Sequence, residues 1–449
     1  MTMAEHASFN RWYTRMAVLF ATLAGFSMGA HVVAIDGFFF PMGKSYFAII
    51  QTHGYVQFMG WVGLFIIGVS LYFFPRISHV PIKEKNQNLI LTFISTGLII
   101  RYVAHNIVFY LNGDDAIHST IWLIFIGTSL VLLGVIYYSI LLGQSVGKTR
   151  ASSALDKIKP IKGFLFLTLL GWVIYNTVQV VLTWEMVEEG SLFMNQLHNN
   201  WSIKVFINLV ILPICFAVSV RTFPLYLRLP AIKWHVENLV AWYAAGAGLE
   251  LYYIKGWWTD IGSLIRIIAV IVFILRLDIL FRRKSPWTYF QKEPYKVDRL
   301  NKPRKGYPDF GEWGRFELLV RSSYFWLFIA MVLEFIQILT LIFHLPFVIY
   351  PDGFRHMIVL GFATQLIFGM APRMIPGFMR KRKVAYQSAV VWTFWLVNLA
   401  VVTRTAPILF SGKYFTHFMG ALYGFSGIFG MAAIIIFSIN MWRTTSLDS

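Results

Sequence analysis

The chain has 449 residues, of which 57% are hydrophobic, 17% aromatic and only 13% charged, and its mean hydropathy is +0.62. Soluble domains carry about 25% charged residues, so this composition excludes a soluble globular enzyme and predicts an all-α polytopic membrane protein. The single cysteine, Cys215, excludes disulfides within the chain, thiolate zinc sites and iron–sulfur clusters. A bound metal would therefore need His, Met or carboxylate ligands.

Twelve stretches of the chain are apolar over about 20 residues, the length that a helix needs to cross a membrane. We expect transmembrane helices at residues 15–39, 47–74, 87–111, 117–143, 161–184, 203–227, 234–254, 260–281, 319–346, 354–379, 385–410 and 415–442. The N-terminus lacks the pattern of a cleavable signal peptide, so the first span is expected to remain in the mature protein. A basic, proline-interrupted segment at 282–318 is expected to be a loop that covers the cytoplasmic face.

The positive charge is distributed unevenly between the loops. The net charge is 39 − 21 = +18, and Lys and Arg gather before the first span and in the even-numbered loops, as at Arg15, Lys83, Lys148, Arg228 and Arg380. By the positive-inside rule, both termini are cytoplasmic in a bacterial inner membrane. The charge then reflects topology and contact with the anionic lipid bilayer, and no nucleic-acid partner is needed to explain it.

The second and tenth spans share a pattern that predicts an internal duplication. Each has a histidine at its outer end, His53 or His356, then two glycines eight residues apart, and a proline seven residues after the second glycine. Each is followed by a span that contains an arginine, Arg101 or Arg404. We interpret this as a 6+6 arrangement, with an N-terminal half at 1–233 and a C-terminal half at 234–449. The alternative is coincidence between glycine-rich helices.

Histidines gather on the predicted outer side of the membrane. Eight of the eleven lie there, and five of these lie in apolar helical sequence: His31, His53, His105, His356 and His417. Neutral imidazole is a common ligand of haem iron and copper, so the pattern predicts a metal or haem centre near the periplasmic surface. The alternative is that a histidine at a helix end only hydrogen-bonds to water or to a carbonyl group.

Arginines and glycines in the same half support a flat, anionic cofactor. Arg101, Arg266, Arg355 and Arg404 map to the outer half, where they would pair with haem carboxylates. Their alternative role is to pair with outer acidic side chains such as Glu250 or Asp260. Gly420, Gly424 and Gly427 share one helical face. Such a face admits a porphyrin plane, and equally a neighbouring helix.

Two segments carry a resemblance to a known family. HGYVQFMGWVGLFIIGVSLYFFPR in the second span and RHMIVLGFATQLIFGMAPRMIPGF in the tenth resemble the NnrS family, which are twelve-span haem- and copper-containing membrane proteins of the nitric oxide response. More distantly they are similar to the large subunits of haem–copper oxidases and nitric oxide reductases. The resemblance implies a bundle of that type, with haem b held by His53 and His356.

The sequence also departs from those oxidases. The tenth span has one histidine where they have two, and their copper-binding histidines are not matched, so an oxygen-reducing centre of their type is not expected. Copper or a second haem would need His31, His105, His344 or His417. We expect some of His31, His105 and His417 to form a second metal centre that is open to a small gas; otherwise they pack or support other ligands and the protein only transfers electrons.

Three functions remain open at this level. The first is a haem protein that handles nitric oxide or electrons, which would make it a haem-dependent oxidoreductase. The second is an anchor subunit that relays electrons between quinol and a periplasmic cytochrome. The third is a secondary transporter, which the twelve spans and two similar halves suit. A transporter is expected to have carboxylates near the middle of the membrane, but here the ionisable residues gather at one face, and Glu334 is the main exception.

Overall fold

The computed structural model describes residues 8–149, 152–229, 232–252, 256–281, 304, 309–345, 349–410 and 416–446, and this part of the chain is helical, without a strand. The first six spans comprise α1 (Arg11–Phe20), η2 (Ala21–Phe26) and α2 (Ser27–Phe38); α3 (Tyr46–Tyr55), η3 (Val56–Gly63) and α4 (Leu64–Ser78); α5 (Glu84–Ile107) with η4 (Val108–Tyr110); α6 (Asp114–Gly147); α8 (Lys162–Glu189), after the short α7 (Ser152–Ile158) and η5 (Lys159–Ile161); and α9 (Gln196–Val205), η6 (Phe206–Ile211) and α10 (Leu212–Tyr226).

The remaining spans follow the same order as the prediction. They are α11 (Val236–Tyr252); α12 (Trp257–Leu277); α14 (Phe316–Ile342); α15 (Pro351–His356), η7 (Met357–Thr364) and α16 (Gln365–Phe378); α17 (Gln387–Phe410); and α18 (His417–Thr444). Within the described residues, ten helices are long and apolar enough to cross a membrane; α11 and α12 are the other two expected spans. The prediction of an all-α, multi-pass membrane protein is confirmed.

The second, sixth and tenth spans form the centre of the molecule. In their most apolar stretches 83%, 78% and 83% of the residues are buried, against 28–56% in the other seven of these ten spans. Each central span contains a π-helical segment, η3, η6 or η7, and each has a proline near its end, at Pro75, Pro224 or Pro376. Such π segments often occur at functional sites, so the centre is the first place to examine.

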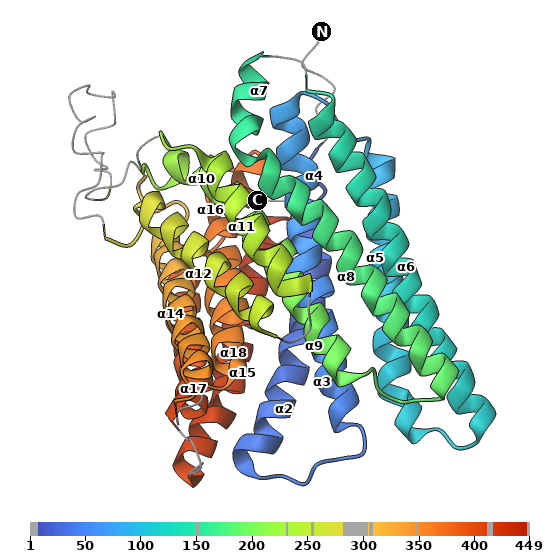
Figure 1. Ribbon diagram of the computed structural model, residues 1–449. Coiled ribbons are helices and arrows are strands. Elements are labelled where there is room, and N and C mark those ends of the chain that lie inside the picture. The colour runs from blue at the N-terminus through green and yellow to red at the C-terminus, as the bar shows by residue number, and fades with distance from the viewer. Residues whose placement is uncertain are drawn as a thin grey trace.

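Helix packing repeats with a period of four spans. The twelve spans form three consecutive groups of four. Within each group the third and fourth spans pack closely, as α5 on α6, α11 on α12 and α17 on α18. Neighbouring groups meet where α6 contacts α8, α12 contacts α14 and α18 contacts α2. In Figure 1, α5, α6 and α8 run side by side at one edge of the molecule. Three groups of four helices therefore surround the central spans. The division into halves at residue 233 stays a prediction, since the second and tenth spans also correspond in a four-span repeat.

The glycine face of α18 is used for helix packing. A Cβ atom at Gly424 would lie 2.7 Å from the Phe38 ring, and one at Gly427 would lie 2.7 Å from the Cα atom of Ala30. Phe38 and Ala30 belong to α2, which covers this face. These glycines therefore allow close packing against another helix, and they do not face a space for a porphyrin plane in the described structure.

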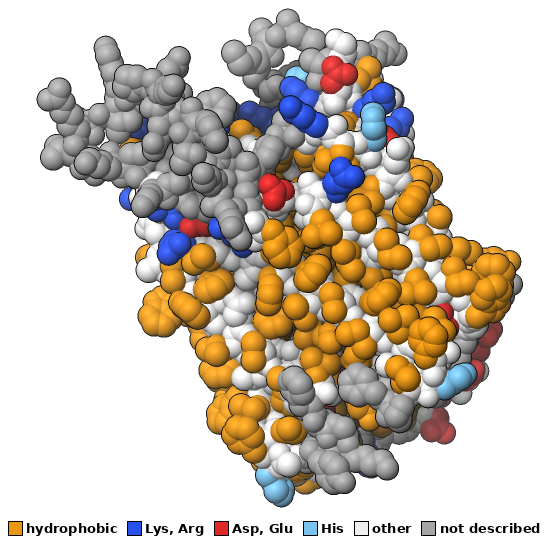
Figure 2. Space-filling model, turned by 60° about the vertical axis from the view of Figure 1, so that its left-hand side comes forward, with side chains coloured by type: hydrophobic (Ala, Val, Ile, Leu, Met, Phe, Trp, Pro, Cys, Tyr) orange, Lys and Arg blue, Asp and Glu red, His pale blue; other side chains and the backbone are white. Residues whose placement is uncertain are grey.

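The two ends of the bundle differ in charge. Figure 2 shows Lys and Arg side chains around one end, which we call the basic end, and a broad apolar band below it. Arg15 in α1 donates hydrogen bonds to Thr445 (3.2 Å) and Ser446 (3.4 Å), so both ends of the described chain lie at the basic end. The opposite end carries His53, His105, His356 and His417, and we call it the histidine end.

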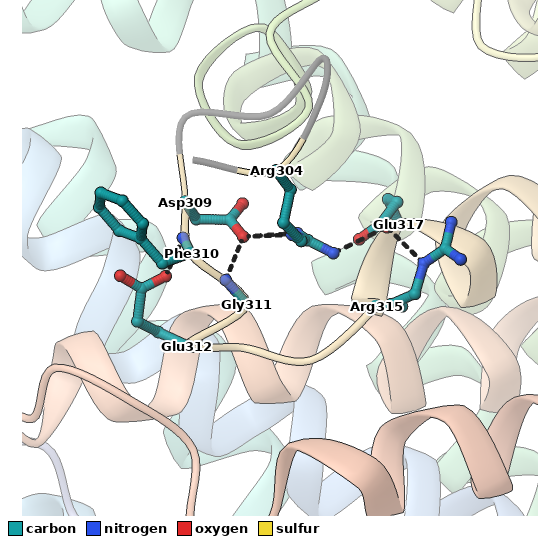
Figure 3. A network of polar contacts seen from close by, with 7 residues as sticks. All are labelled: Arg304, Asp309, Phe310, Gly311, Glu312, Arg315 and Glu317. Carbon is teal, nitrogen blue, oxygen red and sulfur yellow. Dashed lines mark hydrogen bonds and ion pairs between the residues drawn. The ribbon is translucent and has the colours of Figure 1, made fainter. Parts of the chain in front are cut away.

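A polar network at the basic end leads into α14 (Figure 3). Arg304 donates to Asp309 (2.8 Å) and to Glu317 (3.1 Å), and Arg315 donates to the same oxygen of Glu317 (3.3 Å). Asp309 and Glu317 are 4% and 1% exposed, so the arginines compensate buried carboxylates. The predicted cytoplasmic loop at 282–318 includes this network; its residues 282–303 and 305–308 lie outside the described part of the chain.

Candidate functional site at the histidine end

His53 and His356 lie at equivalent places on two central spans. His53 is in α3, three residues before η3, and His356 is the last residue of α15, directly before η7. In both, Nδ1 lies next to a backbone carbonyl oxygen: Gly25 O at 2.8 Å from His53, and Asp352 O at 2.7 Å from His356. The two rings interact electrostatically with each other and with Arg404, so the fold brings them to one region.

The carbonyl partners determine the tautomer of both rings. A carbonyl oxygen only accepts, so Nδ1–H is the donor in each ring, and Nε2 carries the lone pair. A hydrogen bond from one ring nitrogen to a carbonyl is the usual arrangement of a histidine that ligates metal through the other nitrogen. Within the described residues, Nε2 of His53 makes no hydrogen bond, and it has the lone pair that a metal requires.

Gly29 makes room for the imidazole of His53. A Cβ atom at residue 29 would lie 2.6 Å from Cε1 and 3.2 Å from Nε2 of His53. A side chain there would displace the ring. The Gly25-x-x-x-Gly29 pair of the first span thus serves the position of His53: Gly25 supplies the carbonyl group and Gly29 the space.

Nε2 of His356 is occupied in this structure. Arg404 in α17 lies 3.1 Å from it through Nη2, and because a guanidinium only donates, the imidazole is the acceptor. The guanidinium carbon of Arg404 also lies 4.3 Å from the centre of the Tyr423 ring in α18. Nη1 of Arg404 is buried and makes no hydrogen bond in the described structure. The same arginine thus caps the imidazole through Nη2, while its Nη1 has no hydrogen-bond partner in the described structure.

A cavity of about 330 Å³ adjoins this arginine. Small-ligand pockets occupy about 300–1,000 Å³, so the space suits a small ligand or part of a larger one. Asp36 accepts a hydrogen bond from Tyr46 (2.5 Å) at its edge, which places an acid between the first two spans. The cavity is lined by Asp36, Tyr350, Asp352, His356, Arg404, Ile408 and Tyr423.

His105 and Arg101 are held in a separate cluster of the third span. His105 is fully buried, with Nδ1 2.9 Å from the Thr52 hydroxyl and Nε2 3.2 Å from Leu192 O, so both ring nitrogens have partners. Arg101 donates to Thr128 (3.2 Å) and Gln179 (3.0 Å) and contacts Met194, and its guanidinium carbon lies 3.5 Å from the centre of the Tyr55 ring. His105 therefore presents no free nitrogen to a metal in this arrangement.

The other predicted residues are not brought together. His31 and His417 are exposed, and His417 packs against the Phe39 ring with 5.0 Å between ring centres. Arg355 pairs with Asp352 (3.3 Å) and donates to Asn200 (3.2 Å). In the described part of the chain, no three His, Cys, Asp or Glu side chains form a group that would hold a metal ion. The second metal centre stays a prediction that no contact supports.

Sequence reasoning missed several members of the site. Asp36, Tyr46 and Tyr423 come from three different spans, and only their placement near Arg404 reveals them. The sequence alone could have indicated Asp36, because an acidic residue within an apolar span is a candidate functional residue. Arg266, by contrast, pairs with Glu250 as its alternative interpretation predicts, and Glu334 joins the pair; both distances are 2.5 Å.

Comparisons of the chain with models of known protein families and with curated protein sequences find no match. The class of protein is thus given by the fold alone: a multi-pass membrane protein with a polar site at one end of its central spans.

Proposed function

We propose that the chain is an integral membrane haem protein of the NnrS type, with His53 and His356 as axial ligands of a b-type haem at the histidine end. The supporting observation is their shared arrangement. Each lies on a central span beside a π segment and donates Nδ1–H to a backbone carbonyl, so that the Nε2 lone pair is the ligand. A bound haem supplies one-electron chemistry.

Arg404 has two roles in this proposal. Its Nη2 donates to Nε2 of His356, so if that nitrogen were to hold a haem, the arginine would have to turn away from it. The released guanidinium is then available to a haem carboxylate in a low-dielectric site, where charge-assisted hydrogen bonds are strong. Arg355, paired with Asp352 beside the same cavity, is a second cation in reach of such a group. Arg101 is enclosed by its own partners and links the third span to the fourth and fifth.

Electron transfer is the reaction that this ligand set suits best. Two imidazoles complete the coordination of haem iron and leave no open position. The protein would therefore pass electrons between quinol and a periplasmic cytochrome, as a respiratory anchor subunit does. Direct handling of nitric oxide would need copper or a second haem with an open position. The proposal includes a bacterial inner membrane with both termini in the cytoplasm, as the charge of the basic end favours.

A visible spectrum and metal analysis of the purified full chain test the proposal. We expect a Soret band and one haem per chain, and His53→Ala and His356→Ala should each lose it. His118→Ala is the control, because His118 is exposed and accepts a hydrogen bond from Trp122 of its own helix. No Soret band in the wild type, or unchanged haem content in His53→Ala, refutes the assignment. More than one haem, or bound copper, with a carbon monoxide shift would restore a gas-binding function.

A secondary transporter is the second candidate, and one observation favours it. Glu250, Arg266 and Glu334 form a charged cluster between α11, α12 and α14, with exposures of 2%, 1% and 13%. Lys204 lies 3.9 Å from Glu250. Charged groups inside a membrane often mark ion or substrate pathways. A haem-free protein whose Glu334→Gln variant abolishes uptake of a substrate into proteoliposomes would replace the haem proposal with this one.

A further inference from the structure

A second cavity lies between the three central spans, on their basic side. It measures about 60 Å³ and is bounded by α4, α10 and α16 with the adjoining π segments η3 and η7. Val69, Cys215, Val218, Ala363 and Met370 are among the side chains that line it. It is formed by other residues than the cavity beside His356, and it draws on all three central spans at once.

The lining is apolar, and its one hydroxyl is already used. Ser70 donates to Ile67 O (2.9 Å) and its oxygen lies 2.8 Å from the Tyr138 hydroxyl, in the direction of the fourth span. The remaining lining side chains are aliphatic, aromatic or sulfur-containing. A buried water needs two to four polar partners, so this cavity offers water no stable position.

An unfilled apolar pocket of this size is costly, because its lining atoms lose contacts on one side. Elsewhere the central spans are packed tightly: the rings of Phe58 and Phe206 stack with 4.5 Å between centres, and those of Phe216 and Phe273 with 4.1 Å. The gap thus lies at the meeting point of the three central spans, which elsewhere make close ring contacts.

We propose that this cavity is a binding site for small, uncharged, apolar molecules, from a gas of one or two atoms to a short hydrocarbon. Apolar cavities in protein interiors bind xenon and benzene because such ligands restore the missing contacts without requiring a polar partner. Room for one water-sized sphere takes about 10–15 Å³, so the volume of about 60 Å³ holds a few heavy atoms and is too small for a whole lipid chain. The site would be a reservoir for apolar solutes that enter from the bilayer. This inference does not rest on the haem proposal.

Xenon is the probe, used on the purified full chain. We would compare xenon exchange by nuclear magnetic resonance in the wild type, in Val218→Phe, which fills the cavity, and in Val181→Phe, which makes the same change on the exposed face of α8. Xenon that dissolves in the detergent contributes equally to all three samples. We expect a bound signal in the wild type and in Val181→Phe, and its loss in Val218→Phe.

Crystals under xenon pressure locate the ligand. The expected anomalous peak lies beside Cys215 and Val218. Ala363→Leu is a second filling variant, so the test stands if Val218→Phe does not fold, as judged by its elution profile and helical circular dichroism. Equal xenon binding in the wild type and in a folded filling variant overturns the proposal. So does continuous density for a lipid or detergent chain in the cavity, since the site would then bind tails.

Discussion

Arg404 donates a hydrogen bond to Nε2 of His356 across 3.1 Å, from the eleventh span to the tenth. His53, the equivalent histidine of the second span, has no such partner in the described structure, although both rings anchor Nδ1 on a carbonyl group. The two histidines are therefore alike in orientation and unlike in availability. A ligand that binds both Nε2 atoms must displace Arg404 from His356, whereas at His53 it displaces no hydrogen-bond partner.

Removal of the Arg404 side chain should expose His356. In Arg404→Ala, Nε2 loses its donor, and its free lone pair should attack diethylpyrocarbonate, so His356 should be modified faster in haem-free protein. A charge-assisted hydrogen bond contributes about 1.5–3 kcal/mol, which corresponds to an acceleration of about tenfold or more. Peptide mass spectrometry measures the rate. Arg355→Ala is the control, because Arg355 contacts Asn200 and Asp352 rather than the ring. Equal rates in wild type and Arg404→Ala would show that Arg404 does not cap the nitrogen.

A methyl group at residue 29 should displace His53. Gly29→Ala places Cβ 2.6 Å from Cε1 of the ring, so the ring or the helix must move, at a cost of about 1–3 kcal/mol. Denaturation by dodecyl sulfate measures stability, and haem content should fall in parallel. Gly54→Ala, next to His53, is the matched control, because no atom lies within 4 Å of its Cβ position. Identical losses in both variants would contradict a specific role of Gly29.

Arg266 should be essential to stability only while its two acids are charged. Arg266→Met leaves Glu250 and Glu334 buried without the arginine that pairs with both, and we expect a loss of about 3–5 kcal/mol. The triple variant with Glu250→Gln and Glu334→Gln removes the uncompensated charge and should recover most of that loss. Thermal unfolding of the detergent-solubilised protein compares them. A triple variant no more stable than Arg266→Met would mean that the cluster acts through packing.

Cysteine labelling in intact cells tests the orientation. In a Cys215→Ser background, Lys83→Cys is an exposed site at the basic end and Asp114→Cys an exposed site at the histidine end. A membrane-impermeant maleimide should label Asp114→Cys directly and Lys83→Cys only after the membrane is permeabilised, because basic loops stay in the cytoplasm. The reverse pattern would place the histidine end, and the proposed haem, on the cytoplasmic side.

Local sequence was enough to place the helices. Each expected span, such as 87–111 or 117–143, overlaps a helix of the structure, here Glu84–Ile107 and Asp114–Gly147. A long apolar run in a membrane must satisfy its own backbone hydrogen bonds, so composition alone determines that it is helical. The boundaries differ by a few residues, because the helices extend past the apolar stretch into polar first turns, which begin at Asp114 and Glu84.

The sequence by itself determined the class of the protein, the order of the helices and the equivalence of His53 and His356, because each depends on residues close together in the chain. Only the tertiary structure decided what these groups touch. His105 and His356 look alike in sequence, yet His105 bonds to Thr52 and Leu192, while His356 bonds to Arg404, 48 residues away. The glycine face of α18 proved to contact α2, at the opposite end of the sequence. Apolar periodicity specifies that a face is buried and carries no information about which distant helix buries it, so partners of this kind emerge only when the whole bundle is packed.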